Sequence, residues 1–249
     1  MSLYKTKGII LRTHKLGEAD RIVTILTSNL GKVSAVAKGV RKTKSKFGSR
    51  LEPFMHVDLV LYKGRNLDIV TQAEIIDSFS GIRDNFDRIT YGSAMLDLTN
   101  KVAIEGERDV ALYNLLLKGL SVISGVKKNF RLLLIAFDIK LTAISGYMPK
   151  LERCVVCEKG LGAKMHFSFQ WGGVVCDDCK VSDRNSIVVT PAAVETLSRL
   201  LRRPLLEAID MDVIARTEDE LYLLMHDYIA YYIQARLKSR ECLSQLACS

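Results

Sequence analysis

Two pairs of cysteines set the strongest constraint on how this chain can fold. The motifs are Cys154-Val-Val-Cys157 and Cys176-Asp-Asp-Cys179, and residues 158–175 separate them. Each pair can place two thiolates on one ion through a tight turn, and two such turns complete a tetrahedral site with four sulfur ligands. The spacing is typical of zinc ribbons. We therefore predict one Zn²⁺ per chain on these four cysteines, with an iron–sulfur cluster or redox-active thiols as the alternatives.

The predicted compartment favours metal binding over disulfides. The chain opens with no signal peptide, and it contains no run of the about 18 apolar residues that a membrane helix needs. We therefore expect a cytoplasmic protein, in which thiols stay reduced. Four sulfur ligands leave no open coordination position, so we expect the metal to be structural and not catalytic. The two other cysteines, Cys242 and Cys248, are interpreted as free thiols.

Positive charge is concentrated in the first third of the chain. The 249 residues contain 36 Lys and Arg against 28 Asp and Glu, a formal net charge of +8. Residues 1–80 account for 14 of these basic and 7 of these acidic residues, whereas residues 81–249 are almost neutral. Such asymmetry is expected when one module faces a polyanion and the remainder does not. The first 80 residues are therefore the predicted nucleic-acid-binding module.

One segment carries much of this charge. Residues 38–50 contain six basic residues and no acidic residue. A solvated loop is the alternative interpretation, but Gly, Ser and Thr between the charges would let a phosphate backbone approach, and Phe47 offers a ring on which a base could stack. The predicted DNA contacts are Lys38, Arg41, Lys42, Lys44, Lys46, Phe47 and Arg50, together with Arg12 and Arg21.

The first 80 residues have the pattern of a small β-barrel. Short apolar, β-branched runs separated by turn signals occur at residues 7–12, 21–27, 32–37, 56–62 and 67–73. Five strands in so short a segment favour a closed barrel, because closure removes exposed sheet edges. The connection between the third and fourth runs is much longer than the others, which favours an OB-fold, with an SH3-like barrel as the alternative.

Helical periodicity follows Phe79. Apolar residues at spacings of three and four predict helices at residues 85–105, 109–124, 129–145, 190–201 and 217–238. The predicted class is therefore α+β. We expect an OB-fold DNA-binding domain at residues 1–80 and a helical domain at residues 81–249, with a zinc-ribbon-like insertion at residues 151–183.

No catalytic motif accompanies these binding signals. The sequence lacks a phosphate-binding P-loop, a dinucleotide-binding glycine motif, a nucleophile elbow and a zinc-protease motif. We therefore predict a binding protein that is not an enzyme. The alternatives are a zinc-ribbon RNA-binding protein acting in translation or transcription, and a metal-dependent enzyme.

Several segments together resemble the bacterial RecO family of DNA repair proteins. In chain order they are Gly8-Ile-Ile-Leu-Arg12, Gly17-Glu-Ala-Asp20-Arg21, Lys38-Gly39-Val-Arg41, Leu51-Glu-Pro53-Phe54 and Ser145-Gly-Tyr147-Met-Pro149, the last leading into Cys154. The resemblance extends over nearly the whole chain. This sequence departs from the family pattern after the first cysteine pair, where Glu158 replaces the usual glycine.

The resemblance implies an OB-fold, a helical domain with a zinc site, and a role as recombination mediator of the RecF pathway in DNA repair. It implies binding of single- and double-stranded DNA, annealing of complementary strands and, with RecR, loading of recombinase onto DNA coated by single-strand binding protein. Implied partners are RecR, in some species RecF, and the C-terminal tail of single-strand binding protein, in a nucleoid-associated, cytoplasmic setting. That tail is acidic with an apolar end, so its pocket should combine basic and hydrophobic groups. The candidate residues are Arg199, Arg202 and Arg203, beside Leu200 and Leu201.

Overall fold

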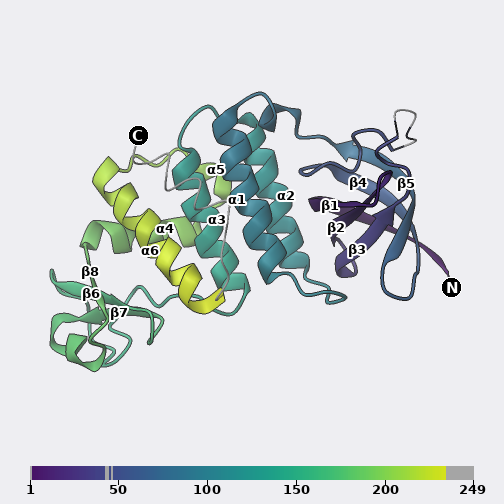
Figure 1. Ribbon diagram of the computed structural model, residues 1–249. Coiled ribbons are helices and arrows are strands. Elements are labelled where there is room, and N and C mark those ends of the chain that lie inside the picture. The colour runs from purple at the N-terminus through teal and green to yellow at the C-terminus, as the bar shows by residue number, and fades with distance from the viewer. Residues whose placement is uncertain (1, 43–44, 46, 234–249) are drawn as a thin grey trace. The chain divides into compact units, whose positions relative to one another are not determined.

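The computed structural model describes residues 2–42, 45 and 47–233 (Figure 1). These residues form two compact units, one ending at Gly125 and the other beginning at Val126. The first unit contains the barrel and two helices, so the predicted domain boundary at residue 80 lies inside it and stays a prediction. Among the described residues, no helix has the length and apolar character needed to cross a membrane.

Five strands close into a barrel, which confirms the predicted OB-fold (Figure 1). The strands are β1 (Leu3–Leu16), β2 (Asp20–Thr27), β3 (Gly31–Ala37), β4 (His56–Tyr62) and β5 (Asp68–Asp77), in the order β1-β2-β3-β5-β4. The long β1 pairs with β4 through its first half and with β2 through its second half, and a bulge lies between Ile10 and Arg12. Such a bulge bends a strand, which helps one strand to serve both neighbours.

The connection between β3 and β4 contributes apolar side chains to the core of the barrel. Phe47, Leu51 and Met55 from this connection are buried in the same core as inward-facing strand residues such as Val57 and Leu59. Apolar burial of this kind fixes the backbone of a segment that has no regular secondary structure of its own. The connection is therefore fixed from Phe47 to Met55 by its buried apolar side chains.

Two helices complete the first unit: α1 (Phe86–Val102) and α2 (Val110–Gly125), preceded by a 3₁₀ turn at Ser80–Ile82. The Asp109 carboxylate accepts a hydrogen bond from the Leu112 backbone N–H at 2.8 Å and so caps the start of α2. His56 of the barrel and Tyr113 of α2 form a buried hydrogen bond of 2.9 Å between Nε2 and the hydroxyl. The Phe54 ring lies so close to Gly92 of α1 that an added Cβ would be 3.1 Å from it. These contacts join barrel and helices.

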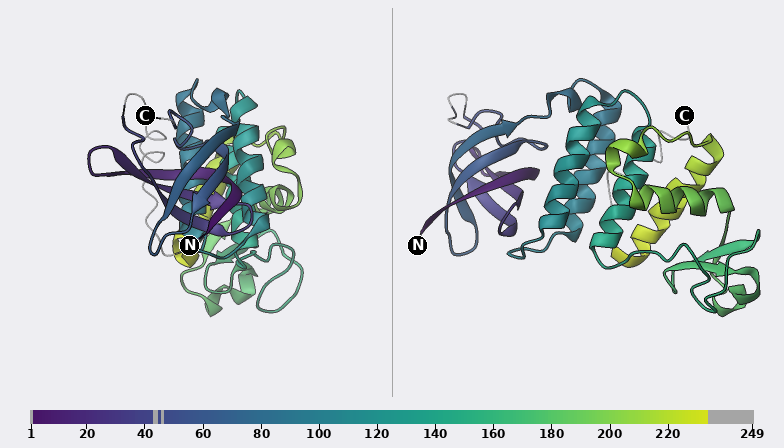
Figure 2. Two further views of the ribbon diagram at one scale, coloured as in Figure 1. Left: turned by 90° about the vertical axis from the view of Figure 1, so that its right-hand side faces the viewer. Right: turned by 180° about the vertical axis from the view of Figure 1, so that it is seen from behind.

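The second unit combines helices with a small sheet. Its elements are α3 (Phe130–Ile144), α4 (Pro191–Arg202), α5 (Leu205–Ala208), α6 (Ala215–Ile233), β6 (Met165–Ser168), β7 (Gly173–Cys176), β8 (Ile187–Val189) and the 3₁₀ helix η2 (Asp177–Ser182). The sheet, in the order β7-β6-β8, forms a separate lobe beside the helices of this unit (Figure 2). It is inserted between α3 and α4, as predicted for the cysteine-bearing segment. Residues 234–238 of the last predicted helix lie outside the described residues.

Candidate metal centre and nucleic-acid interface

The four predicted ligands come together at one point of the insertion. The Sγ atoms of Cys154, Cys157, Cys176 and Cys179 all lie within 4.8 Å of one another. A tetrahedral site with Zn–S bonds of about 2.3 Å has S···S edges of about 3.8 Å. The distance between the Cys157 and Cys176 sulfurs is 3.8 Å, far longer than a disulfide bond of about 2.05 Å. The four cysteines are therefore placed to bind a metal ion.

Hydrogen bonds within the cluster shift the pKa values of two of the thiols in opposite directions. Burial raises the pKa of the Cys154 thiol, but hydrogen bonds from backbone N–H groups, including that of Cys176 at 3.4 Å, outweigh it and lower the pKa to about 6. Hydrogen bonds with the Cys176 and Cys157 sulfurs raise the pKa of Cys179 to about 12. A bound cation would deprotonate every ligand and remove this asymmetry, since coordinating thiols lose their protons.

Three contacts hold the two cysteine turns in place. The Val155 N–H donates to the Val174 carbonyl at 2.9 Å, which joins the first turn to β7. Near the second turn, Asp177 accepts from Lys180 at 2.9 Å and lies 3.1 Å from Nε2 of His166. His166 is thus engaged by a carboxylate outside the group of four sulfurs.

Glu158 explains why a glycine is usual after the first pair. Its φ of 60° lies in the left-handed region, where a side chain is unfavourable and glycine is not. The Glu158 N–H still donates to the Cys154 carbonyl at 2.9 Å, so the turn forms despite the substitution. The departure from the family pattern is therefore a strained residue within an intact turn.

The basic segment begins beside the turn between β1 and β2. Arg41 donates from Nη1 to the carbonyl oxygens of Gly17 at 3.1 Å and Glu18 at 2.8 Å, and the Gly39 N–H donates to Asp20 at 2.7 Å. Part of the Arg41 guanidinium is thus used to tie two loops together. This structural use of Arg41 was not evident from the sequence.

The other predicted DNA contacts are placed unequally. Lys38, Lys42, Arg50 and Arg12 are exposed, so they are accessible to a ligand. Arg21 forms an ion pair with Glu52, so its charge is already compensated within the barrel. Lys44 and Lys46 lie outside the described residues.

The expectation for Phe47 requires a correction. Its side chain is only 2% exposed and belongs to the barrel core. A ring in this position has no open face on which a base could stack. Burial of Phe47 in the core therefore anchors this part of the chain, and the predicted contact with a base is wrong.

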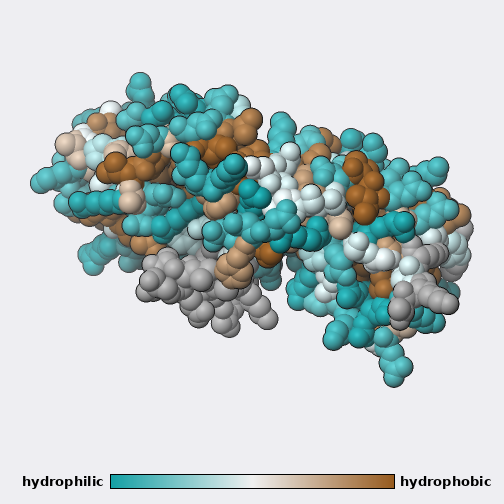
Figure 3. Space-filling model, turned by 90° about the horizontal axis from the view of Figure 1, so that it is seen from above, coloured by the Kyte–Doolittle hydropathy of each residue, from teal (hydrophilic) through white to brown (hydrophobic). Residues whose placement is uncertain are grey.

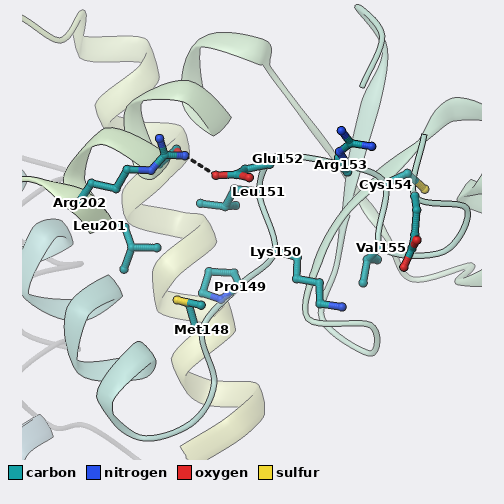
Figure 4. A pocket seen from close by; sticks show the side chains of 12 residues that line it. Met148, Pro149, Lys150, Leu151, Glu152, Arg153, Cys154, Val155, Leu201 and Arg202 are labelled. Carbon is teal, nitrogen blue, oxygen red and sulfur yellow. Dashed lines mark hydrogen bonds and ion pairs between the residues drawn. The ribbon is translucent and has the colours of Figure 1, made fainter. Parts of the chain in front are cut away.

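One of the three predicted partner-binding arginines lines a cavity of about 620 Å³. Arg202 and Leu201 of α4 line one side, and residues 148–155 line the other (Figure 4). Arg202 pairs with Glu152 at 2.5 Å across this cavity. Arg199 and Arg203 are exposed but do not line it, and Leu200 is buried in the core.

Comparison with known proteins gives matches along almost the entire chain. Residues 1–79 match the family model described as "Recombination protein O N terminal", and residues 83–241 match "Recombination protein O C terminal". A relative named "DNA repair protein RecO" from a Nocardioides species is 42% identical over 241 residues, covering 95% of this chain and 97% of the relative. Relatives with the same name from Thermobifida fusca and Pelotomaculum thermopropionicum are 43% and 34% identical, covering 81% and 98% of this chain and 83% and 95% of their own lengths.

Proposed function

Because the chain belongs to the RecO family of DNA repair proteins, we propose that it is a DNA-binding recombination mediator, without catalytic turnover, in the nucleoid-associated cytoplasm. It binds single- and double-stranded DNA through the barrel of the first unit and anneals complementary strands. With RecR, and with RecF where a species has it, it helps to load recombinase onto DNA coated by single-strand binding protein.

The observation that carries this proposal is the fixed backbone under the exposed lysines. Phe47 anchors one end of the basic segment in the barrel core, and Arg41 ties the other end to the β1–β2 turn. Lys38 and Lys42 extend from this support and are exposed. Cations on an ordered backbone lose less conformational entropy when they bind phosphates, and phosphate contacts supply most of the affinity of sequence-independent binding.

The proposal is tested by removing two charges that the fold does not use. In the double variant Lys38→Ala and Lys42→Ala, affinity for a single-stranded oligonucleotide should fall, and the slope of log affinity against log salt should decrease by about 0.7 for each lysine that contacts a phosphate. Fluorescence anisotropy of labelled DNA measures both quantities. Lys118→Ala, which removes an exposed lysine of α2, is the matched control.

Two results would contradict this proposal. Unchanged affinity and slope in the double variant would remove the basic segment from DNA binding. Tighter binding to an RNA of the same sequence would favour the alternative function in translation or transcription.

We also propose that the metal at the four cysteines is Zn²⁺. The 3.8 Å sulfur separation fits a metal–thiolate tetrahedron, and the spacing of the two cysteine pairs, typical of zinc ribbons, supports zinc as the metal. With all four positions filled by sulfur, the ion would cross-link the two cysteine turns and supply no reactive water. Elemental analysis of protein purified without chelator should find about one zinc per chain. Iron with visible absorbance would contradict the assignment.

For the tail of single-strand binding protein, we propose the cavity beside α4. Leu201, Pro149 and Met148 give it apolar surface, and Arg202, Lys150 and Arg153 give it positive charge. The Arg202–Glu152 pair is 64% and 75% exposed, and exposed pairs of this kind contribute little stability. A carboxylate of the tail could therefore replace Glu152 at low cost.

A labelled acidic peptide ending in an apolar residue tests this location. Arg202→Glu should weaken peptide binding by more than about tenfold, because it places a like charge against the ligand. Arg199→Glu makes the same charge change outside the cavity lining and is the control. Equal effects of the two substitutions would indicate general charge attraction and would exclude the cavity as the specific site.

A further inference from the structure

A cluster of aromatic rings lies where the β6–β7 hairpin packs on the C-terminal half of α6. We call the exposed part, made of Tyr147, Trp171 and Tyr231, the aromatic surface. These side chains are 42%, 47% and 48% exposed, respectively. Figure 3 shows one face of the molecule, on which teal hydrophilic side chains are interspersed with brown apolar areas. Neither the metal centre nor the basic segment accounts for them.

Two of these rings are supported on one face and exposed on the other side. Tyr147 lies against Tyr232, with ring centroids 4.6 Å apart and an interplanar angle of 32°. Tyr231 is stacked on Phe169, with centroids 6.0 Å apart and an angle of 29°. The Tyr231 and Tyr232 centroids are themselves 5.0 Å apart, so both supported rings belong to one group.

Hydrogen bonds fix the rings beneath the aromatic surface. The Tyr232 hydroxyl donates to the Phe169 carbonyl at 2.7 Å, and the Tyr228 hydroxyl donates to the Tyr147 carbonyl at 3.1 Å. Burial raises the pKa of both hydroxyls, so their protonation as donors extends to still higher pH. Gly172 lets the hairpin approach, because its φ is +64° and an added Cβ would lie 3.0 Å from the Tyr232 hydroxyl.

The backbone of a lysine runs beside the hairpin that carries Trp171. The Lys150 backbone pairs with the hairpin, donating to the Gly172 carbonyl at 3.0 Å and accepting from the Val174 N–H at 2.9 Å. Its side chain is exposed. The Lys150 backbone is therefore held beside Gly172, the residue that follows Trp171 in the chain. Exposed rings next to a cation are the elements with which proteins bind single-stranded nucleic acid.

We propose that the aromatic surface is a second DNA contact, at which Tyr147, Trp171 and Tyr231 stack on bases of single-stranded DNA while Lys150 contacts a phosphate. This inference rests on the proposed DNA-binding function and locates a contact on the second unit. Rings already ordered by stacking and hydrogen bonding lose little entropy when a base is added. The contact selects single strands, because the bases of a duplex are already stacked on one another.

The chain carries its own probe for this contact. Trp171 is the one tryptophan among all 249 residues, so intrinsic tryptophan fluorescence reports on this site alone. Titration of the full-length protein with an oligothymidylate should quench the emission in parallel with binding measured by anisotropy of labelled DNA. A duplex of equal length, at equal bound fraction, should quench it much less.

Variants separate stacking from a structural role. Tyr147→Ala and Tyr231→Ala should each reduce affinity for single strands by about fivefold or more, with little change for duplex DNA. Phe86→Ala removes a 64% exposed ring of α1 in the first unit and should leave both affinities unchanged. Retained metal content shows that the insertion stays folded in each variant.

The outcomes distinguish this inference from the proposed function. If the protein binds DNA through the basic segment, but Trp171 is not quenched and both tyrosine variants bind normally, the aromatic surface is not a DNA contact and the proposed function stands. Quenching by RecR or by the acidic peptide, but not by DNA, would likewise overturn the inference. Absence of any DNA binding in the anisotropy assay would overturn both.

Discussion

The described part of the β3–β4 connection and the cysteine-bearing insertion are held in different ways. The first is anchored by Phe47, Leu51 and Met55 in the barrel core. The second brings four sulfurs within 4.8 Å of one another. The first depends on apolar burial, which needs only water, whereas the ion proposed for the second would have to be supplied by the surroundings.

The largest expected effect comes from removing one ligand of the proposed metal site. Cys154→Ser should reduce bound metal to near zero and destabilise the second unit, because structural zinc contributes about 10–16 kcal/mol of apparent binding free energy in small domains. DNA binding through the barrel should persist. Elemental analysis and thermal unfolding measure the first two effects. Cys242→Ser, at a predicted free thiol outside the described residues, is the control, and equal metal loss in both variants would contradict the four-cysteine site.

The second effect tests the apolar anchor. Phe47→Ala should cost about 3–5 kcal/mol in free energy of unfolding, because it leaves a cavity in the barrel core. Metal content should stay unchanged, in contrast to Cys154→Ser. Chemical denaturation measures the loss, and Phe86→Ala, at an exposed ring, should stay within about 0.5 kcal/mol of the parent. A Phe47→Ala variant as stable as the parent would exclude the anchoring role.

A smaller effect tests the barrel–helix contact through pH. Burial lowers the pKa of His56 below its ordinary value of 6.5, so the unfolded chain binds the proton more readily than the folded one. The free energy of unfolding should therefore fall as pH drops below about 6.5. Tyr113→Phe, which leaves the buried His56 nitrogen without its partner, should cost about 1–3 kcal/mol at pH 7.5. Chemical denaturation at pH 7.5 and 5.5 measures both effects. A free energy of unfolding that is the same at the two pH values would contradict the lowered pKa of His56.

The smallest effect concerns the strained turn of the metal-held segment. Glu158→Gly should stabilise the insertion by about 1 kcal/mol, because glycine adopts a φ of 60° without a steric penalty. Glu158→Ala keeps the penalty and should give no gain. The rate at which a chelator removes the metal measures the difference, and it should be lower for Glu158→Gly than for Glu158→Ala. Equal retention of metal by the two variants would indicate that the turn is not strained.

Local spacing predicted the features that depend on neighbouring residues. The two cysteine pairs predicted the cluster of four sulfurs, and short apolar, β-branched runs such as residues 56–62 predicted the barrel strands. The role of Phe47 was mispredicted, because a charged segment without periodicity does not show which ring will face a core. Its spacing of four residues from Leu51, and of Leu51 from Met55, is the one signal that could have suggested burial.

Long-range pairings were beyond such reasoning. The Arg21–Glu52 ion pair and the Tyr147–Tyr232 stack each join residues that become neighbours only in the folded chain. Neither charge nor ring type selects a partner at such sequence separation. The aromatic surface therefore became visible only when the hairpin and α6 were seen together.

The position of β1 has a consequence for the protein during its synthesis. Leu3 pairs with Tyr62, so one edge of the first strand stays open until the fourth strand has emerged from the ribosome. An open, apolar strand edge invites aggregation with neighbouring chains. Lys5 and Lys7 are exposed along this half of β1, and charged side chains at a strand edge discourage such pairing. Two lysines of the basic barrel are thus placed where they would discourage such pairing in the nascent chain.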